Sequence, residues 1–90
     1  MYSKSVFIGN PSGLHARPAS DFIKCAKTYS CRITIAEEGR EKEAVNAKSI
    51  VCLLTLGLTQ GKRAVITAKG DAEEEAVEAL AALVEGGFGE

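Results

Sequence analysis

The chain has 90 residues, a net charge of −1 and 46% hydrophobic residues. This length predicts one domain spanning residues 1–90, with a composition ordinary for a globular protein. The charge balance argues against a nucleic-acid binder that neutralises phosphates, and no apolar run reaches the roughly 18 residues of a membrane helix. No apolar stretch follows Met1–Ser5, so we expect a cytoplasmic protein that is neither secreted nor inserted in a membrane.

The cysteines are Cys25, Cys31 and Cys52, an odd number without CxxC spacing, and the chain has one histidine. These residues match no zinc-site pattern, and we expect neither a metal ion nor another cofactor. The simplest interpretation is three partly buried thiols in a reducing compartment. A Cys25–Cys31 redox pair is the alternative, and nothing in the sequence favours it.

Apolar and polar residues alternate in several segments, as in strands that bury one face. The predicted strands are Ser3–Ile8, Cys31–Ile35, a short strand near Ala44 and Val45, and Arg63–Ala68. Turn-forming residues gather at Asn10–Gly13 and Gln60–Lys62. The charged run Glu37–Glu43 is interpreted as a solvated hairpin connection.

Apolar residues recur at helical spacing in three other segments. A first helix is predicted from His15 to about Lys27, with Pro18 in its first turn, where the missing N–H costs nothing. Its buried face comprises Ala19, Phe22, Ile23 and Ala26. A second, short helix is predicted from Lys48 to Leu56, ended by Gly57. Its inward residues are predicted to be Ile50, Leu53 and Leu54.

The last helix is predicted to begin at Asp71–Glu74, which resembles a capping box. Asp71 would accept hydrogen bonds from the first helical N–H groups, and Glu74 would reach back. Its buried stripe comprises Ala76, Val77, Leu80, Leu83 and Val84. Gly86 and Gly87 are expected to end the helix and leave a frayed tail.

The predicted order is therefore β-α-β-β-α-β-α, without internal repeats. Each element has one apolar face, and the economical way to bury all of them is one sheet with helices packed on one side. We therefore expect an α+β two-layer sandwich.

The only histidine lies in the run Gly13-Leu14-His15-Ala16-Arg17-Pro18-Ala19, where a helix is predicted to begin. A helix N-terminus binds anions through its unpaired N–H groups, and histidine can form covalent catalytic intermediates. His15 is thus a candidate acceptor of a phosphoryl group, with the Arg17 guanidinium two residues away. The alternatives are a plain capping or surface histidine and a solvated Arg17. Ser12 could donate to the phosphate or form the turn, and we favour the turn.

The run Ser12–Ala19 resembles the active-site motif of HPr, the histidine-containing phosphocarrier family of the sugar phosphotransferase system. A second run, Asn46–Val51 continuing through Thr55–Leu58, is similar to the regulatory-serine segment of that family. The spacing of the two runs and the total length also agree, so the resemblance covers nearly the whole chain. It implies an HPr-like open-faced β-sandwich, whose four-stranded antiparallel sheet has the order 1-4-2-3 and carries three helices on one face.

The resemblance also implies a function. His15 would accept a phosphoryl group on Nδ1 from phospho-enzyme I, which phosphoenolpyruvate charges, and pass it to IIA components of sugar permeases. Arg17 would balance the phosphate charge, and the chain would be a carrier, not an enzyme. Ser49 matches a serine that a dedicated kinase phosphorylates in some bacteria, which would add a serine kinase or phosphatase and a transcriptional regulator to the partners. The implied docking residues are Lys24, Lys27, Ile50, Val51 and Thr55.

We expect a monomer that meets its partners transiently through partly exposed apolar residues of the second helix. Two features depart from the family pattern: the hairpin Glu37–Glu43 is longer than usual, and Cys52 stands where glycine or a polar residue is commoner. Ser49 could also be only the N-cap of its helix.

Three other functions stay open. The first is a regulatory paralogue that acts through Ser49, and the second is a phosphocarrier of a nitrogen-related branch. The third is a small enzyme with His15 as general base, for which the motif offers no second acid, base or metal ligand.

Overall fold

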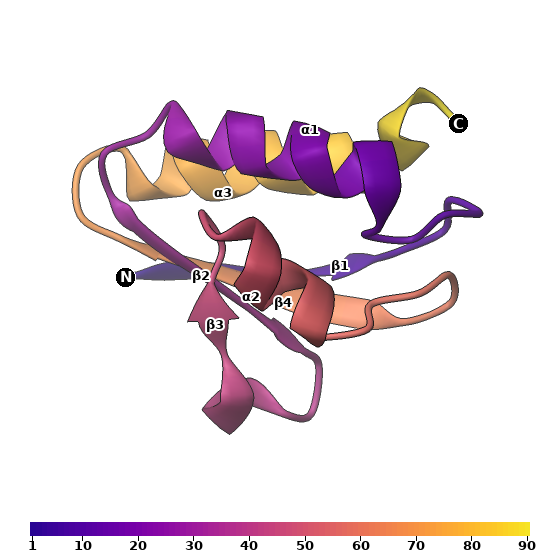
Figure 1. Ribbon diagram of the computed structural model, residues 1–90. Coiled ribbons are helices and arrows are strands. Elements are labelled where there is room, and N and C mark those ends of the chain that lie inside the picture. Colours follow the sequence, from indigo (N-terminus) through magenta and orange to yellow (C-terminus); the bar gives the residue numbers. More distant parts are fainter.

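Four strands form one antiparallel sheet, and three helices cover one of its faces (Figure 1). The computed structural model describes all residues, 1–90. The strands are β1 (Tyr2–Phe7), β2 (Arg32–Glu37), β3 (Val45–Asn46) and β4 (Arg63–Lys69); the helices are α1 (Ala16–Lys27), α2 (Ile50–Thr55) and α3 (Glu73–Glu85). The strand order β1-β4-β2-β3 confirms the predicted open-faced sandwich. None of the helices has the length and apolar character needed to cross a membrane.

Strand β4 lies inside the sheet and pairs with β1 on one side and β2 on the other. Its alternating sequence turns Ala64, Ile66 and Ala68 into the core, where all three are fully buried. Because alanine side chains are short, α3 packs directly on β1 and β4. The strand predicted over 63–68 is therefore confirmed, with one further residue at its end.

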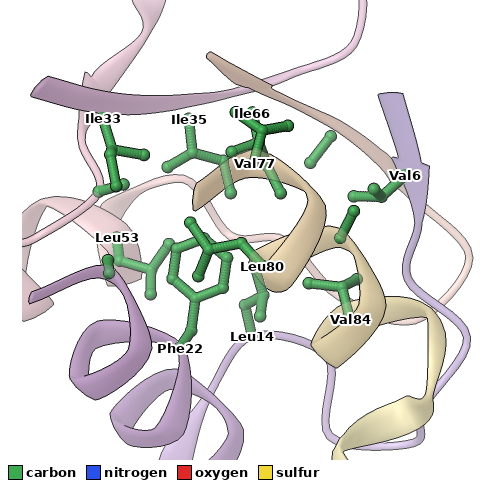
Figure 2. Close-up of a cluster of buried hydrophobic side chains, with 14 of the residues drawn as sticks. Val6, Leu14, Phe22, Ile33, Ile35, Leu53, Ile66, Val77, Leu80 and Val84 are labelled. Atoms are coloured by element: carbon green, nitrogen blue, oxygen red, sulfur yellow. The ribbon is translucent and has the colours of Figure 1, made fainter. Parts of the chain in front are cut away.

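Helix α1 buries the predicted face, together with Pro18. The Phe22 ring points from α1 into the middle of the core (Figure 2). It belongs to one continuous cluster of 21 buried residues, which includes Leu14, Leu53 and Leu80 as well as the sheet residues Ile33, Ile35 and Ile66. This packing fixes α1, and with it the residues that precede the helix, against the sheet.

The predicted capping box at the start of α3 is wrong. The N-cap is Ala72, which has a left-handed backbone (φ 55°, ψ 32°), and no side chain caps the helix there. This conformation starts the helix one residue later, so Asp71 lies outside the N-cap position. Glu73 acts instead: its carboxylate accepts from the Gly70 N–H at 3.0 Å and pairs with the Met1 amino group at 2.7 Å.

The prediction for α2 is partly wrong. The helix is shorter than predicted, and Gly57 follows it in a left-handed conformation (φ 61°), as expected. Leu53 is fully buried, whereas Ile50 and Leu54 are 41% and 42% exposed. A helix of six residues turns less than half of its side chains toward one neighbour, and here Leu53 occupies that place.

The structure differs from the sequence predictions in three smaller ways. The charged run 37–43 is solvated as expected and contains a 3₁₀ turn, η1 (Glu41–Glu43), before β3. On α3, Ala81 is buried where Leu83 was predicted, and Leu83 is half-buried. The predicted frayed tail is wrong, because a second 3₁₀ turn, η2 (Gly87–Gly89), folds the chain back after α3.

Candidate functional site

His15 is the N-cap residue of α1, with an extended backbone (φ −132°, ψ 164°) and a half-buried side chain. The N–H groups of Ala16 and Arg17 come before the first N–H that donates within the helix, and Pro18 has no N–H. The first backbone bond of the helix runs from the Ala19 N–H to the His15 carbonyl, at 3.5 Å. Two N–H groups beside the imidazole thus have no hydrogen-bond acceptor in the protein. This is the arrangement in which a helix N-terminus binds an anion.

The turn before His15 is held against the loop that follows α2. The Leu14 N–H donates to the Leu58 carbonyl at 2.8 Å, and both side chains are buried. At Gly13, which has a positive φ of 61°, an added Cβ would lie 2.5 Å from the Leu58 oxygen. Only glycine fits such a backbone approach. This contact brings the segment 12–19, which contains His15, next to the end of the segment 46–58, which contains Ser49.

The backbone beyond His15 is strained. Ala16 has a φ of 52°, which alanine rarely adopts. Such residues cost about 1–3 kcal/mol and persist where the surrounding structure holds them in place. The strain lies directly between His15 and Arg17, at the point where the chain must turn from the loop into α1.

The three basic residues predicted on α1 are all exposed. Arg17, Lys24 and Lys27 take part in none of the ion pairs of the protein. No hydrogen bond joins the guanidinium of Arg17 to His15 in this state. Helix α1 therefore presents cations that are free to meet an anionic group.

Ser49 is the N-cap of α2, and its Oγ accepts a hydrogen bond from the Cys52 N–H at 3.3 Å. The capping role considered for this serine is thus present. The predicted docking residues Ile50 and Val51 are exposed, Val51 by 69%. The Thr55 hydroxyl is also exposed but donates to the Cys52 carbonyl at 2.6 Å. Helices α1 and α2 are in contact, so the basic and the apolar residues form neighbouring surfaces.

None of the surface pockets is lined by His15 or Arg17. The half-buried imidazole thus lies outside these pockets, beside the exposed residues Ala16 and Arg17. No cluster of three or more potential metal ligands exists in the protein. The three cysteines are free, and burial raises the pKa of the Cys25 thiol, which lowers its reactivity.

Comparison with known proteins matches residues 2–86 to the family model described as "PTS HPr component phosphorylation site". The phosphocarrier protein HPr of Haemophilus influenzae is 48% identical over 84 residues, which cover 93% of this chain and 95% of that protein. The chain belongs to the HPr family of the phosphotransferase system. Its members are phosphocarrier proteins.

Two further comparisons extend this result. The crystal structure of HPr-C-His from Thermoanaerobacter tengcongensis matches with a TM-score of 0.92 at 42% identity, covering 100% of this chain and 98% of that one. A multiphosphoryl transfer protein of H. influenzae is 39% identical over 83 residues, which cover 92% of this chain but 17% of that protein. An HPr-like segment is thus also part of a longer protein whose name refers to phosphoryl transfer.

Two residues beside this HPr motif, Asn10 and Glu90, were not identified in the sequence analysis. Asn10 is 3% exposed, and its Nδ2 donates to the Gly13 carbonyl at 2.9 Å and to Glu90 at 3.0 Å. Ser12 donates to the Glu90 carboxylate from its hydroxyl, at 2.8 Å. Ser12 itself lies in the turn before His15. The turn composition at Asn10 offered a weak signal, whereas nothing in the sequence pointed to Glu90.

Proposed function

We propose that this HPr-family chain carries a phosphoryl group on His15 Nδ1, taken from phospho-enzyme I and passed to IIA components of sugar permeases. In the accepting step, the lone pair of Nδ1 forms a bond to phosphorus as the bond between phosphorus and its donor breaks. The proton of the neutral imidazole stays on Nε2. The return step reverses these changes toward the next acceptor, so the chain is a carrier whose own state is restored.

The observation that carries the proposal is the place of His15 at the N-cap, beside the unpaired N–H groups of Ala16 and Arg17. The positive end of a helix favours the anionic oxygens of the transferred group. The exposed guanidinium of Arg17 can add charge-assisted hydrogen bonds.

The place of the imidazole, outside the surface pockets and beside the exposed residues Ala16 and Arg17, also supports a carrier. A group that must leave again cannot be held too tightly, and the partner proteins supply the remaining contacts to the transition state. We assign docking to the exposed side chains around the site. The apolar residues Ile50 and Val51 and the neighbouring Thr55 would contact the partner, while Lys24 and Lys27 would attract an acidic surface.

The test is phosphorylation of the purified chain by phosphoenolpyruvate, magnesium and a catalytic amount of enzyme I. Intact mass should increase by one phosphoryl group, acid treatment should remove it, and His15→Ala should not gain it. Arg17→Ala should gain it more slowly, because the charge-assisted bonds are lost. A folded wild-type chain that gains no phosphoryl group would refute the carrier function and favour a regulatory paralogue.

We further propose that phosphorylation of Ser49 regulates docking. A phosphate there would lie at the start of α2 and close to exposed Ile50 and Val51. Its charge would repel an acidic partner without a large change in the fold. Ser49→Asp should therefore weaken binding of enzyme I and slow transfer, whereas Ser49→Ala, which lacks the charge, should not. Equal affinity and equal transfer rate of Ser49→Asp and the wild type would rule out this regulation.

A further inference from the structure

The end of the chain folds back onto the turn that leads to His15. After α3, the residues Gly87, Phe88 and Gly89 all have positive φ values, which reverse the chain direction. The Phe88 side chain packs against the core and holds this reversal in place. Figure 1 shows the yellow C-terminal segment at the end of the molecule where α1 begins. Residues 87–90 lie outside the segment that matches the HPr family model.

The Glu90 carboxylate collects three hydrogen bonds from the turn. Oε1 accepts from Asn10 Nδ2 at 3.0 Å and from the Ser12 N–H at 3.1 Å, and Oε2 accepts from the Ser12 hydroxyl at 2.8 Å. These bonds lower the pKa of Glu90, those from Asn10 most and those from the side chain and backbone of Ser12 next. The carboxylate is thus ionised at neutral pH, and all three bonds are charge-assisted.

Asn10 connects Glu90 to the residues directly before His15. Asn10 holds Gly13 by both backbone groups: its carbonyl accepts from the Gly13 N–H at 3.1 Å, and its Nδ2 donates to the Gly13 carbonyl at 2.9 Å. Leu14 is fixed from the other side by the Leu58 carbonyl. The turn that leads to His15 is therefore held at two places, by the loop after α2 and by Glu90.

We propose that Glu90 is a positioning residue for phosphoryl transfer: its carboxylate fixes the turn 10–13 and thereby the place of the His15 imidazole. This inference rests on the proposed function of His15. Glu90 does not contact the imidazole and acts only through Asn10 and Ser12. A nucleophile whose approach is fixed in advance transfers faster, and a small displacement is costly.

The first measurement is the transfer rate from phospho-enzyme I in single turnovers at increasing enzyme I concentration. Glu90→Ala should lower the maximal rate about 3- to 10-fold, because the imidazole is held less firmly, and leave the half-saturating concentration unchanged. Glu90→Gln should stay close to the wild type, because its amide oxygen can accept from the turn and its amide nitrogen can donate to the Ser12 hydroxyl.

The matched control is Glu85→Ala. Glu85 lines the same pocket as Glu90, but its side chain makes no hydrogen bond or ion pair, so both kinetic constants should equal those of the wild type. The second measurement is amide hydrogen exchange at Ser12, which does not depend on transfer. Exchange should be faster in Glu90→Ala than in the wild type and the control.

The outcomes separate this inference from the proposed function. A wild-type chain that enzyme I does not phosphorylate would overturn both. If the wild type is phosphorylated, an unchanged maximal rate in Glu90→Ala would overturn the positioning role alone, even with faster exchange at Ser12. A change confined to the half-saturating concentration would also overturn it, because Glu90 would then act in docking.

Discussion

Gly13 shows at the scale of one residue how the site depends on backbone packing. Gly13 and Gly57 share a φ of 61°, but an added Cβ at Gly57 would meet no atom within 4 Å. Gly57→Ala should therefore cost about 1 kcal/mol, the penalty for a left-handed residue with a side chain. Gly13→Ala should cost at least about 2–3 kcal/mol, because the clash with Leu58 is added. Urea denaturation of both variants measures the difference, and equal losses would contradict the close approach.

The residues to which we assign the chemistry could be singled out from the sequence because they lie close together in the chain. His15 and Arg17 lie within one short motif, and a local pattern is enough to place them at the start of a helix. Glu90 was not predictable, because its contact with Asn10 joins residues 80 positions apart. No local rule relates such positions, and only the folded chain brings them together.

Helix α2 is the clearest case at the scale of one element. Its spacing predicted a helix, and Leu53 was correctly placed in the core, but Ile50 and Leu54 were placed there too. Periodicity gives the direction of each side chain relative to its helix. It does not tell how much of the helix surface the rest of the protein covers.

Truncation of two side chains of α2 should affect different properties, stability in one case and partner binding in the other. Leu53→Ala should lower the free energy of unfolding by about 2–5 kcal/mol, because it opens a cavity in the core. Val51→Ala should change it by less than about 0.5 kcal/mol, since Val51 is 69% exposed. Val51→Ala should instead weaken binding of enzyme I. Urea denaturation and titration with enzyme I measure the two effects, and a large loss of stability in Val51→Ala would contradict its exposure.

The start of α3 explains why a capping pattern can mislead. Asp71 and Glu74 have the spacing of a capping box, but the left-handed backbone of Ala72 moves the helix start past Asp71. Glu73 then binds the Gly70 N–H and the amino group of Met1. That ion pair joins residues 72 positions apart in the chain, so a local pattern could not reveal it.

At the scale of the whole molecule, three carboxylates connect segments far apart in the chain. Glu73 binds the amino terminus, Glu78 accepts from Tyr2 and from Lys4 on β1, and Glu90 binds the turn before His15. In each case the hydrogen bonds lower the carboxyl pKa below its ordinary value. Together they attach α3 and the chain ends to the rest of the protein.

These shifts predict a loss of stability in acid. A carboxyl whose pKa is lower in the folded than in the unfolded state stabilises the fold above the unfolded pKa, and this contribution is lost as the pH falls through the folded pKa. The free energy of unfolding should therefore decrease between about pH 5 and pH 2. Glu78→Gln should be less stable at neutral pH and show a shallower decrease, as urea denaturation at several pH values can measure. Glu75→Gln, an exposed control on the same helix, should follow the wild type.

The sequence by itself determined the order of elements, the sheet topology through the family resemblance, the face of α1 that is buried, and the position of His15 at a helix start. The sheet topology follows only from the resemblance, which two motifs carry, and the other features follow from local periodicity, from turn residues and from the motif around His15. Only the tertiary structure decided which apolar residues of α2 are covered, where α3 begins, and that Glu90 reaches the turn before His15. These features depend on contacts between segments distant in the chain, whose free energies come from packing and hydrogen bonds that no single segment contains.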